Sequence, residues 1–221
     1  MDRGTTTVGN RRTSLIIDPP NGRIPAVTDA GRARSIRVGS FNVDVPASYT
    51  DLSNADRCIM GFNAGPPITP GGYNQNVQIF QTPDHLVLLT EMVHTVRVIP
   101  LDGRQPLDAD VHLWSGDSRG HWEGDTLVVD VTGLSDQTWF DRAGSHHSYQ
   151  LHVVERYTMV SPNHIDYEAT IEDPLVLTEP FTIKMPLYRR LEDNARLMDF
   201  RCVEFVEELM FGEWRRNPLP R

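Results

Sequence analysis

The chain has 221 residues, of which 39% are hydrophobic and 23% are charged. This composition lies far from that of disordered proteins and is sufficient for one domain with a sizeable core. The net charge of −9 argues against a nucleic-acid partner, which would need a basic stripe to neutralise phosphates. No apolar run approaches the length of a transmembrane helix, so we expect no membrane partner either.

The N-terminal end and the cysteines bear on the cellular compartment. Residues 1–7 lack the apolar core of a signal peptide, so we expect a cytoplasmic protein, or a periplasmic one if the chain is the mature form of an exported precursor. Cys58 and Cys202 match neither a zinc site nor a disulfide-dense scaffold. We expect two reduced, packed thiols, with a single bridge between them as the alternative.

Residues 1–75 are interrupted by turn-forming proline and glycine clusters and show little sustained periodicity. We predict an extended arm here, packed on a second region formed by residues 76–221. Within the arm, residues 29–37 favour a short helix, because their alanines and arginines tolerate one.

From residue 76 onward, apolar and polar residues alternate with the period of a β-strand. The expected strands are Val77–Gln81, His85–Glu91, Val93–Pro100, Asp125–Thr132, Gln150–Val160, His164–Glu172, Phe181–Leu191 and Arg196–Cys202. Short connections favour antiparallel neighbours, and eight strands are enough to close a barrel. We therefore predict an all-β fold, an antiparallel β-barrel of lipocalin-like or allene-oxide-cyclase-like form. A short helix over residues 203–211 would cover a barrel end or a sheet edge.

The segment Trp114–Asp130 predicts a β-hairpin with a polar, aromatic rim. Gly116, Gly120 and Gly124 supply turn conformations that other residues resist. After them, apolar and polar residues alternate at strand period.

A small barrel has one natural site, its interior, so polar side chains that share a face with apolar ones are candidates for chemistry. Alternation places His94 on one face with Met92, and Val96 and Val98 continue that apolar row. An imidazole titrates near neutrality, and an apolar lining would keep it uncharged. His94 is therefore the leading acid/base candidate, and a core histidine satisfied by one neighbour is the alternative.

Glu155 is a carboxylate on an otherwise apolar strand face. The residues that share this face are Leu151, Val153, Tyr157 and Met159. An unpaired buried carboxylate is unfavourable, so Glu155 would need a basic partner or would hold a proton and act as an acid. A structural ion pair with Arg97 or Arg156 is the alternative to catalysis.

Three histidines raise the question of a metal. His146 and His152 would share a strand face if the strand began early, yet no HxH or HExxH spacing accompanies them. A histidine pair beside Asp141 is typical of a solvated rim. We expect no metal, and a site built from His94 and His147 stays open as an alternative.

Amides and aromatic residues near the strand ends are candidates for ligand contacts. The amides of Tyr73–Gln78 could orient a ligand or could cap loops. Trp114, Trp122 and Phe140 lie in turn-rich segments, where indole and phenyl rings stack on an aromatic or terpenoid ligand or simply pack at a rim.

Four motifs carry a resemblance to a known family. They are Arg12–Pro25 (RTSLIIDPPNGRIP), His94–Arg104 (HTVRVIPLDGR), Gly116–Asp130 (GDSRGHWEGDTLVVD) and Leu151–Tyr157 (LHVVERY). On these motifs the chain resembles a large, mostly uncharacterised family of bacterial proteins over nearly its whole length. Members of that family often look exported. Many end with a Cys-His-Glu motif where this chain has Cys202-Val203-Glu204, which implies that any chemistry of that histidine differs here or uses His94.

The expected function is that of a cofactor-independent lyase or isomerase, acting on a small hydrophobic, aromatic molecule in the barrel interior. His94 would move the proton, Glu155 would orient or charge-balance it, and Arg97 or Tyr73 would hold a developing oxyanion. The expected substrate-binding side chains are Gln78, Met92, Trp114, Trp122, Phe140 and Tyr157.

Two alternatives stay open. The chain has no dinucleotide-binding glycine loop, P-loop or firm metal motif, which favours chemistry without a cofactor. A non-catalytic binding or carrier protein would instead use His94 and Glu155 as a buried structural pair. A metal-dependent hydrolase would use His94 and His147. In each case the long arm and strand-rich body lead us to expect a homodimer or homotrimer.

Overall fold

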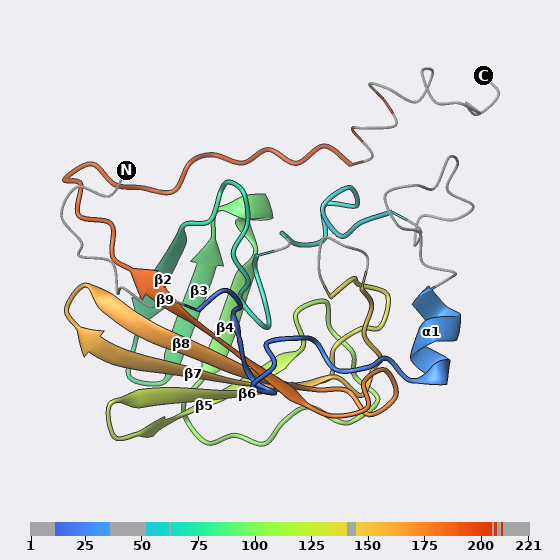
Figure 1. Ribbon diagram of the computed structural model, residues 1–221. Helices are drawn as coiled ribbons and strands as arrows, with labels where there is room; N and C mark the ends of the chain where they lie inside the picture. Colours follow the sequence, from blue (N-terminus) through green and yellow to red (C-terminus); the bar gives the residue numbers. More distant parts are fainter. Residues whose placement is uncertain are drawn as a thin grey trace.

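The computed structural model describes residues 12–35, 52–61, 63–140, 145–204, 206 and 209. Within these ranges the regular structure is nine β-strands in two antiparallel sheets, one α-helix and one short 3₁₀ turn (Figure 1). The expectation of a nearly all-β protein is therefore confirmed.

The larger sheet has six strands in the order β1-β9-β8-β7-β6-β5. Their bounds are β1 Ile16–Asp18, β5 Asp117–Glu123, β6 Thr126–Thr132, β7 His152–Ser161, β8 His164–Glu172 and β9 Phe181–Tyr188. Strands β5 to β9 are consecutive antiparallel neighbours, and β1 joins the free edge of β9. The predicted hairpin forms from β5 and β6, with Gly124 at a φ of 59° in its two-residue loop.

The smaller sheet has three strands in the order β2-β3-β4. Their bounds are β2 Val77–Gln81, β3 His85–Thr90 and β4 Val96–Pro100. In Figure 1 these strands, drawn in green, rise steeply from the strands of the larger sheet. One face of the small sheet covers the larger sheet, and the other face leaves Val96 and Val98 each 53% exposed.

The predicted closed barrel is wrong, because the two sheets stay separate. Strands β4 and β5 run close together without joining one sheet, and Gly120 of β5 lies against Ile99 of β4. At the other end, β2 has no hydrogen-bonded neighbour beyond β3 among the described strands. The result is an open, two-sheet arrangement whose interior reaches the surface beside β2.

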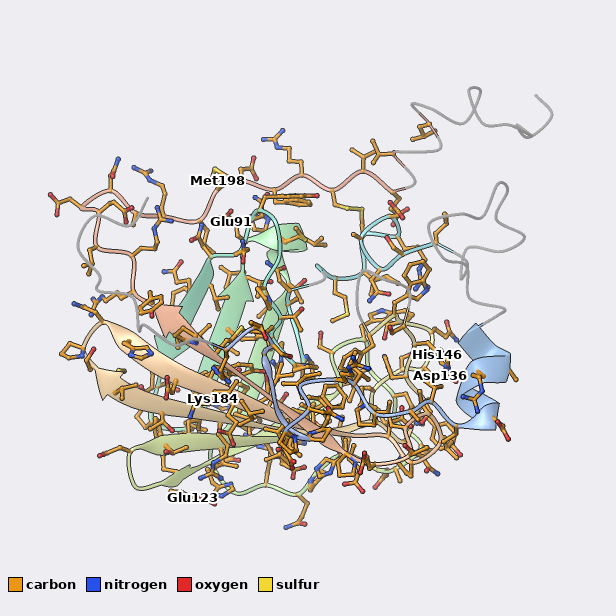
Figure 2. The ribbon with its side chains drawn as sticks, viewed as in Figure 1. Glu91, Glu123, Asp136, His146, Lys184 and Met198 are labelled. Carbon is orange, nitrogen blue, oxygen red and sulfur yellow. A yellow bond between two sulfur atoms is a disulfide. The ribbon has the colours of Figure 1, made fainter. Side chains whose placement is uncertain are left out.

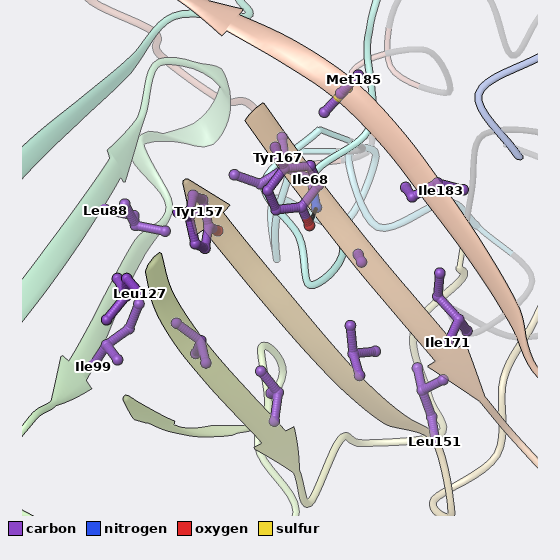
Figure 3. Packing of buried hydrophobic residues seen from close by; sticks show 14 of the residues in the cluster. Ile68, Leu88, Ile99, Leu127, Leu151, Tyr157, Tyr167, Ile171, Ile183 and Met185 are labelled. Atoms are coloured by element: carbon purple, nitrogen blue, oxygen red, sulfur yellow. Dashed lines mark hydrogen bonds between the residues drawn. The ribbon is translucent and has the colours of Figure 1, made fainter. Parts of the chain in front are cut away.

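The hydrophobic core lies between the two sheets. The odd-numbered residues 153–157 of β7 and 167–171 of β8 point inward and are buried, as strand periodicity requires. Figure 3 shows Leu88 and Ile99 of the small sheet facing Leu127, Tyr157 and the other apolar side chains of the large sheet. This burial supplies the main favourable free energy of folding.

The predicted strand over residues 93–100 begins later than expected. Residues Met92–His94 form a 3₁₀ turn, in which Val93 and His94 have positive φ angles of 59° and 49°. This turn shifts the facing of the residues that follow, so Arg97 points inward while Val96 and Val98 point outward. The prediction that His94 shares an inward apolar face with the two valines is therefore wrong.

The arm contributes to the fold in pieces. Its β1 pairs with β9, and Val27 makes an isolated bridge with Leu177. The predicted short helix is present as α1, Asp29–Ser35. At the other end of the chain, most of the predicted terminal helix over 203–211 lies outside the described residues, and so does Asp141.

Residues 189–204, which we call the C-terminal strap, cross the top of the molecule in Figure 1. The predicted strand over residues 196–202 is wrong, because this part of the strap pairs with no sheet. Cys202 at its end forms a disulfide with Cys58, with 5.8 Å between the two Cα atoms, so the expectation of two reduced thiols is also wrong. In the part of the chain that the structure describes, no helix is long and apolar enough to cross a membrane.

Candidate ligand groove

A large cavity among the described residues opens where the two sheets separate, between β2 and the β7–β8–β9 end of the large sheet. Its volume is about 530 Å³, which lies within the usual range for small-molecule sites. A second cavity of about 400 Å³ adjoins it and shares five lining residues, Asn76, Val77, Gln78, Arg189 and Arg190. We refer to the two cavities together as the groove.

The lining of the groove combines apolar and polar side chains. Its apolar lining comes from both sheets and from the loop before β2, and consists of Ile68, Val77, Ile79, Leu88, Tyr157, Met159, Ile165 and Leu187. Its polar lining comes from the amides before β2, the β7–β8 hairpin and the strap, and consists of Gln75, Asn76, Gln78, Asn163, His164, Arg189, Arg190 and Arg196. The groove thus offers one surface for an apolar body and another for polar groups.

A buried polar network lies beneath the floor of the groove. Glu155 is fully buried and forms an ion pair with Arg97, whose Nη2 is 2.5 Å from Glu155 Oε2. Two tyrosine hydroxyls donate to Glu155 Oε1, from Tyr157 at 3.1 Å and from Tyr167 at 2.7 Å. Tyr167 also accepts from the backbone N–H of Ile68 at 2.8 Å. Glu155 therefore has a basic partner, as the alternative to catalysis required, and that partner is Arg97 and not Arg156.

The surroundings of this network keep Arg97 charged and both tyrosines protonated. Burial is the largest single influence on Arg97 and by itself would lower its pKa, but the charge and hydrogen bonds of Glu155 together with the nearby Tyr157 and Tyr167 raise the pKa above its ordinary value. Burial raises the pKa of Tyr157 and of Tyr167 well above the ordinary value, and the Glu155 charge raises both further. At neutral pH the guanidinium therefore stays charged, and both phenols remain hydrogen-bond donors that hold the Glu155 carboxylate.

A second buried carboxylate, Glu91, fixes the polar wall of the groove. It accepts from Asn74 Nδ2 at 3.0 Å and from Asn76 Nδ2 at 2.7 Å. It also accepts from the backbone N–H of Met198 in the strap at 3.2 Å. Figure 2 shows Glu91 directly below Met198. The amide run therefore caps loops at Asn74 and Asn76, and Glu91 holds both the run and the strap in place.

His164 is an imidazole on the groove wall. Its Nε2 lies 3.1 Å from Asp166 Oδ1, and its ring stacks on Tyr188 with 5.2 Å between ring centroids. The nitrogen and oxygen are close enough for ionic attraction but are out of line for a hydrogen bond. A charged partner and a stacked ring thus hold one titratable group beside the groove.

The leading acid/base candidate from the sequence, His94, lies outside the groove. Its side chain is exposed, and its Nε2 accepts from the backbone N–H of Phe200 at 3.3 Å and lies 3.2 Å from Met198 O. His94 therefore contacts the strap and does not line the cavities. Arg97 does not have the expected oxyanion-binding role, because its Nη atoms donate to Glu155 and to Ser118 Oγ.

Of the six expected substrate-binding side chains, Gln78 and Tyr157 line the groove. Met92 is buried against Gly61, and Trp122 is 48% exposed on β5. Trp114 and Phe140 line a separate cavity of only about 20 Å³. Tyr73, the other oxyanion candidate, is 54% exposed and is not among the groove-lining residues.

The histidines considered for a metal do not come together. His147 is buried, with its Nε2 2.8 Å from Thr138 Oγ1, whereas His94 contacts the strap. His152 pairs instead with Asp130 at 3.1 Å. Over the ranges that the structure describes, no group of three potential ligands is close enough to hold a metal ion.

Some groove residues lie beyond the expected barrel interior and were not predicted from the sequence. They are His164, Arg189, Arg190 and Arg196. Adjacent arginines at the end of a predicted strand are a weak signal, because such residues are usually solvated. Only the open side of the two sheets gives them a cavity to line.

No family model matches the chain, and comparisons with curated proteins and with solved structures found no match. The family resemblance of the four motifs therefore stays a prediction, as does the expected homodimer or homotrimer.

Proposed function

We propose that this protein binds a small, largely apolar molecule in the groove. The observation that carries the proposal is a cavity of about 530 Å³ whose apolar floor is continuous with the core. Ile68, Leu88 and Tyr157 form this floor and are themselves well packed. A concave apolar surface with a few polar groups at one side is the usual form of a small-molecule site.

The rigidity of the surroundings supports the same proposal. The ion pair beneath Tyr157, the bonds to Glu91 and the disulfide of the strap fix three sides of the groove. Binding therefore requires little ordering of the protein, which leaves more of the interaction free energy for affinity.

Titration with Nile red, a neutral apolar fluorophore, tests the proposal. Ile79 lines the groove, whereas Phe80, the next residue on β2, does not, and the two are about equally exposed at 42% and 45%. We expect saturable binding that weakens about tenfold in Ile79→Trp, because an indole would fill the cavity, and stays unchanged in Phe80→Trp. No saturable binding, or equal losses in the two variants, would contradict the proposal.

We propose lyase or isomerase chemistry as the second candidate function. The observation that favours it is His164, an imidazole on the groove wall with Asp166 beside it. A histidine with a carboxylate neighbour moves protons near neutral pH, and proton transfer is all that eliminations and double-bond shifts require. In this proposal His164 has the acid/base role that was expected of His94 from the sequence.

Deuterium exchange tests this chemistry without knowledge of the natural substrate. The protein is incubated in heavy water with a panel of aromatic ketones and aldehydes, and deuterium incorporation is measured by mass spectrometry. We expect incorporation by the wild-type protein and by His94→Gln, and loss of it in His164→Gln with Nile red binding retained. Equal incorporation by all three proteins would assign the exchange to solvent or to another residue.

We also propose that the protein works in an oxidising compartment such as the periplasm. The Cys58–Cys202 disulfide supports this proposal, because such bonds persist outside the reducing cytoplasm. Thiol labelling of the protein in rapidly acid-quenched cells tests it. Full labelling of both cysteines would contradict the proposal.

A further inference from the structure

We infer that the ligand of the groove carries a carboxylate, held by Arg189 and Arg196 while its hydrophobic body lies on the apolar floor. This inference rests on the proposed binding function and specifies the chemical class of the ligand. It identifies the occupant as a small hydrophobic or aromatic monocarboxylate.

The charge around the groove differs from the charge of the chain. The chain has 30 acidic and 21 basic residues, a net charge of −9. Neither cavity of the groove has an aspartate or glutamate in its described lining, whereas Arg189, Arg190 and Arg196 line the adjoining parts. A cationic lining within an acidic protein attracts an anion.

Two of these guanidinium groups are not used by the fold. Arg190 is occupied, because its Nη2 and Nε lie 2.8 and 3.1 Å from the carboxylate of Glu192. No ion pair joins Arg189 or Arg196 to an acidic residue anywhere in the described ranges. Other arginines in those ranges have such partners, among them Arg32, Arg97, Arg104, Arg119, Arg156 and Arg201.

The backbone places both arginines at the cavity. The N–H of Arg189 donates to the carbonyl of Asn163 in the β7–β8 hairpin at 3.0 Å, which fixes the residue where β9 ends. A turn in which Ala195 N–H donates to Glu192 O at 2.9 Å then returns the strap toward β2, so that Arg196 lines the same cavity as Arg189. Two residues from different parts of the strap are thereby brought to one site.

An amide beside the arginines adds hydrogen-bonding capacity of the right kind. Gln78 lines both cavities and has no described side-chain hydrogen bond of its own. Its amide group can donate to one oxygen of a carboxylate while a guanidinium donates to the other. The apolar residues Ile165 and Leu187 continue from this polar end into the floor. The lining therefore matches an ion at one end and a hydrocarbon body at the other.

Matched acids and amides test the inference by isothermal titration calorimetry. The probes are benzoate, cinnamate and 1-naphthylacetate, each compared with its neutral amide of nearly the same shape. We expect at least one acid to bind about tenfold more tightly than its amide, because a charge-assisted bond to arginine is stronger than a neutral one. In the double variant Arg189→Gln/Arg196→Gln this preference should fall to about twofold, with amide affinity unchanged.

Controls separate the local effect from the change in net charge. The variant Arg104→Gln/Arg201→Gln removes the same charge from two exposed arginines outside the groove and should keep the tenfold preference. Amides that bind as tightly as the acids, with Nile red still displaced from the groove, would overturn the carboxylate and leave the proposed binding function intact. If Nile red also fails to bind, both proposals fall.

Discussion

Arg97 and Glu155 meet from opposite sheets, and their ion pair lies wholly inside the core, with side-chain exposures of 2% and 0%. Each charge is balanced mainly by the other. The hydroxyls of Tyr157 and Tyr167 also hydrogen-bond to Glu155, and Ser118 hydrogen-bonds to Arg97. This contact therefore adds a buried ion pair to the hydrophobic packing that joins the two sheets.

Breaking this pair from one side should be strongly destabilising. Arg97→Met leaves a buried carboxylate without its cation, and we expect the free energy of unfolding to fall by about 3–5 kcal/mol. The second change, Glu155→Gln, removes that charge and keeps an acceptor for the tyrosines, so the double variant should recover at least half of the loss. Urea denaturation measures all three proteins. Arg104→Met, which breaks the exposed pair with Asp102, should change little, and an Arg97→Met protein as stable as wild type would show that the pair is not needed.

Alkaline pH should unfold the protein through its buried tyrosines. The folded state raises the pKa of Tyr157 and Tyr167, so it holds their protons to higher pH than the unfolded chain does. Stability from this source is complete below about pH 10, where unfolded tyrosine titrates, and falls as the pH rises further. Of the six tyrosines in the chain, two should ionise only when circular dichroism reports unfolding. Tyrosinate absorbance measures this ionisation as the pH is raised.

Removing the disulfide should destabilise the protein and loosen the strap. Cys58 and Cys202 are separated by 144 residues, so Cys58→Ser/Cys202→Ser should lower the free energy of unfolding by about 3–5 kcal/mol through the entropy of the unfolded chain. Differential scanning calorimetry with and without dithiothreitol checks this. Reductant should lower the melting temperature of the wild type and leave the double variant unaffected. An equal response of both proteins would mean that the bond does not form.

The close approach of β4 and β5 should make Gly120 intolerant of any side chain. A Cβ atom there would lie 2.8 Å from Ile99 Cγ2 and 2.6 Å from Leu101 Cδ2, closer than carbon atoms pack. We expect Gly120→Ala to lower the free energy of unfolding by about 1–3 kcal/mol, measured by thermal denaturation. Gly72→Ala is the matched control, because that Cβ would meet nothing within 4 Å. Similar effects of the two changes would contradict the packing described between the sheets.

Much of the secondary structure could be predicted from the sequence, because strand periodicity is a local property. The residues 77–81 and 164–172 form strands with the predicted bounds. The facing of His94 could not be predicted, because two consecutive residues with positive φ precede β4 and neither is glycine. A turn of this kind exchanges the inward-facing and outward-facing residues of the strand that follows, and no feature of the composition marks it.

The candidate site was less predictable than the fold, because it depends on which strands fail to pair. The burial of Glu155 and its need for a basic partner, either Arg97 or Arg156, followed from alternation and from the cost of an unpaired charge, and in the structure that partner is Arg97. The groove itself arises because β2 ends the small sheet without meeting β9. The eight predicted strands were equally consistent with a closed barrel. In a closed barrel the site would lie in the interior, and Arg189 and Arg196 would be ordinary surface residues.

The pairing of β1 with β9 also sets the order in which the molecule can be made. Ile16 lies opposite Ile183, so β1 has no edge to join until β9 has left the ribosome. The strap that carries Arg196 emerges later still. The groove is therefore completed late in synthesis, and a chain interrupted after β8 would contain most of the core but would lack the groove residues of β9 and the strap.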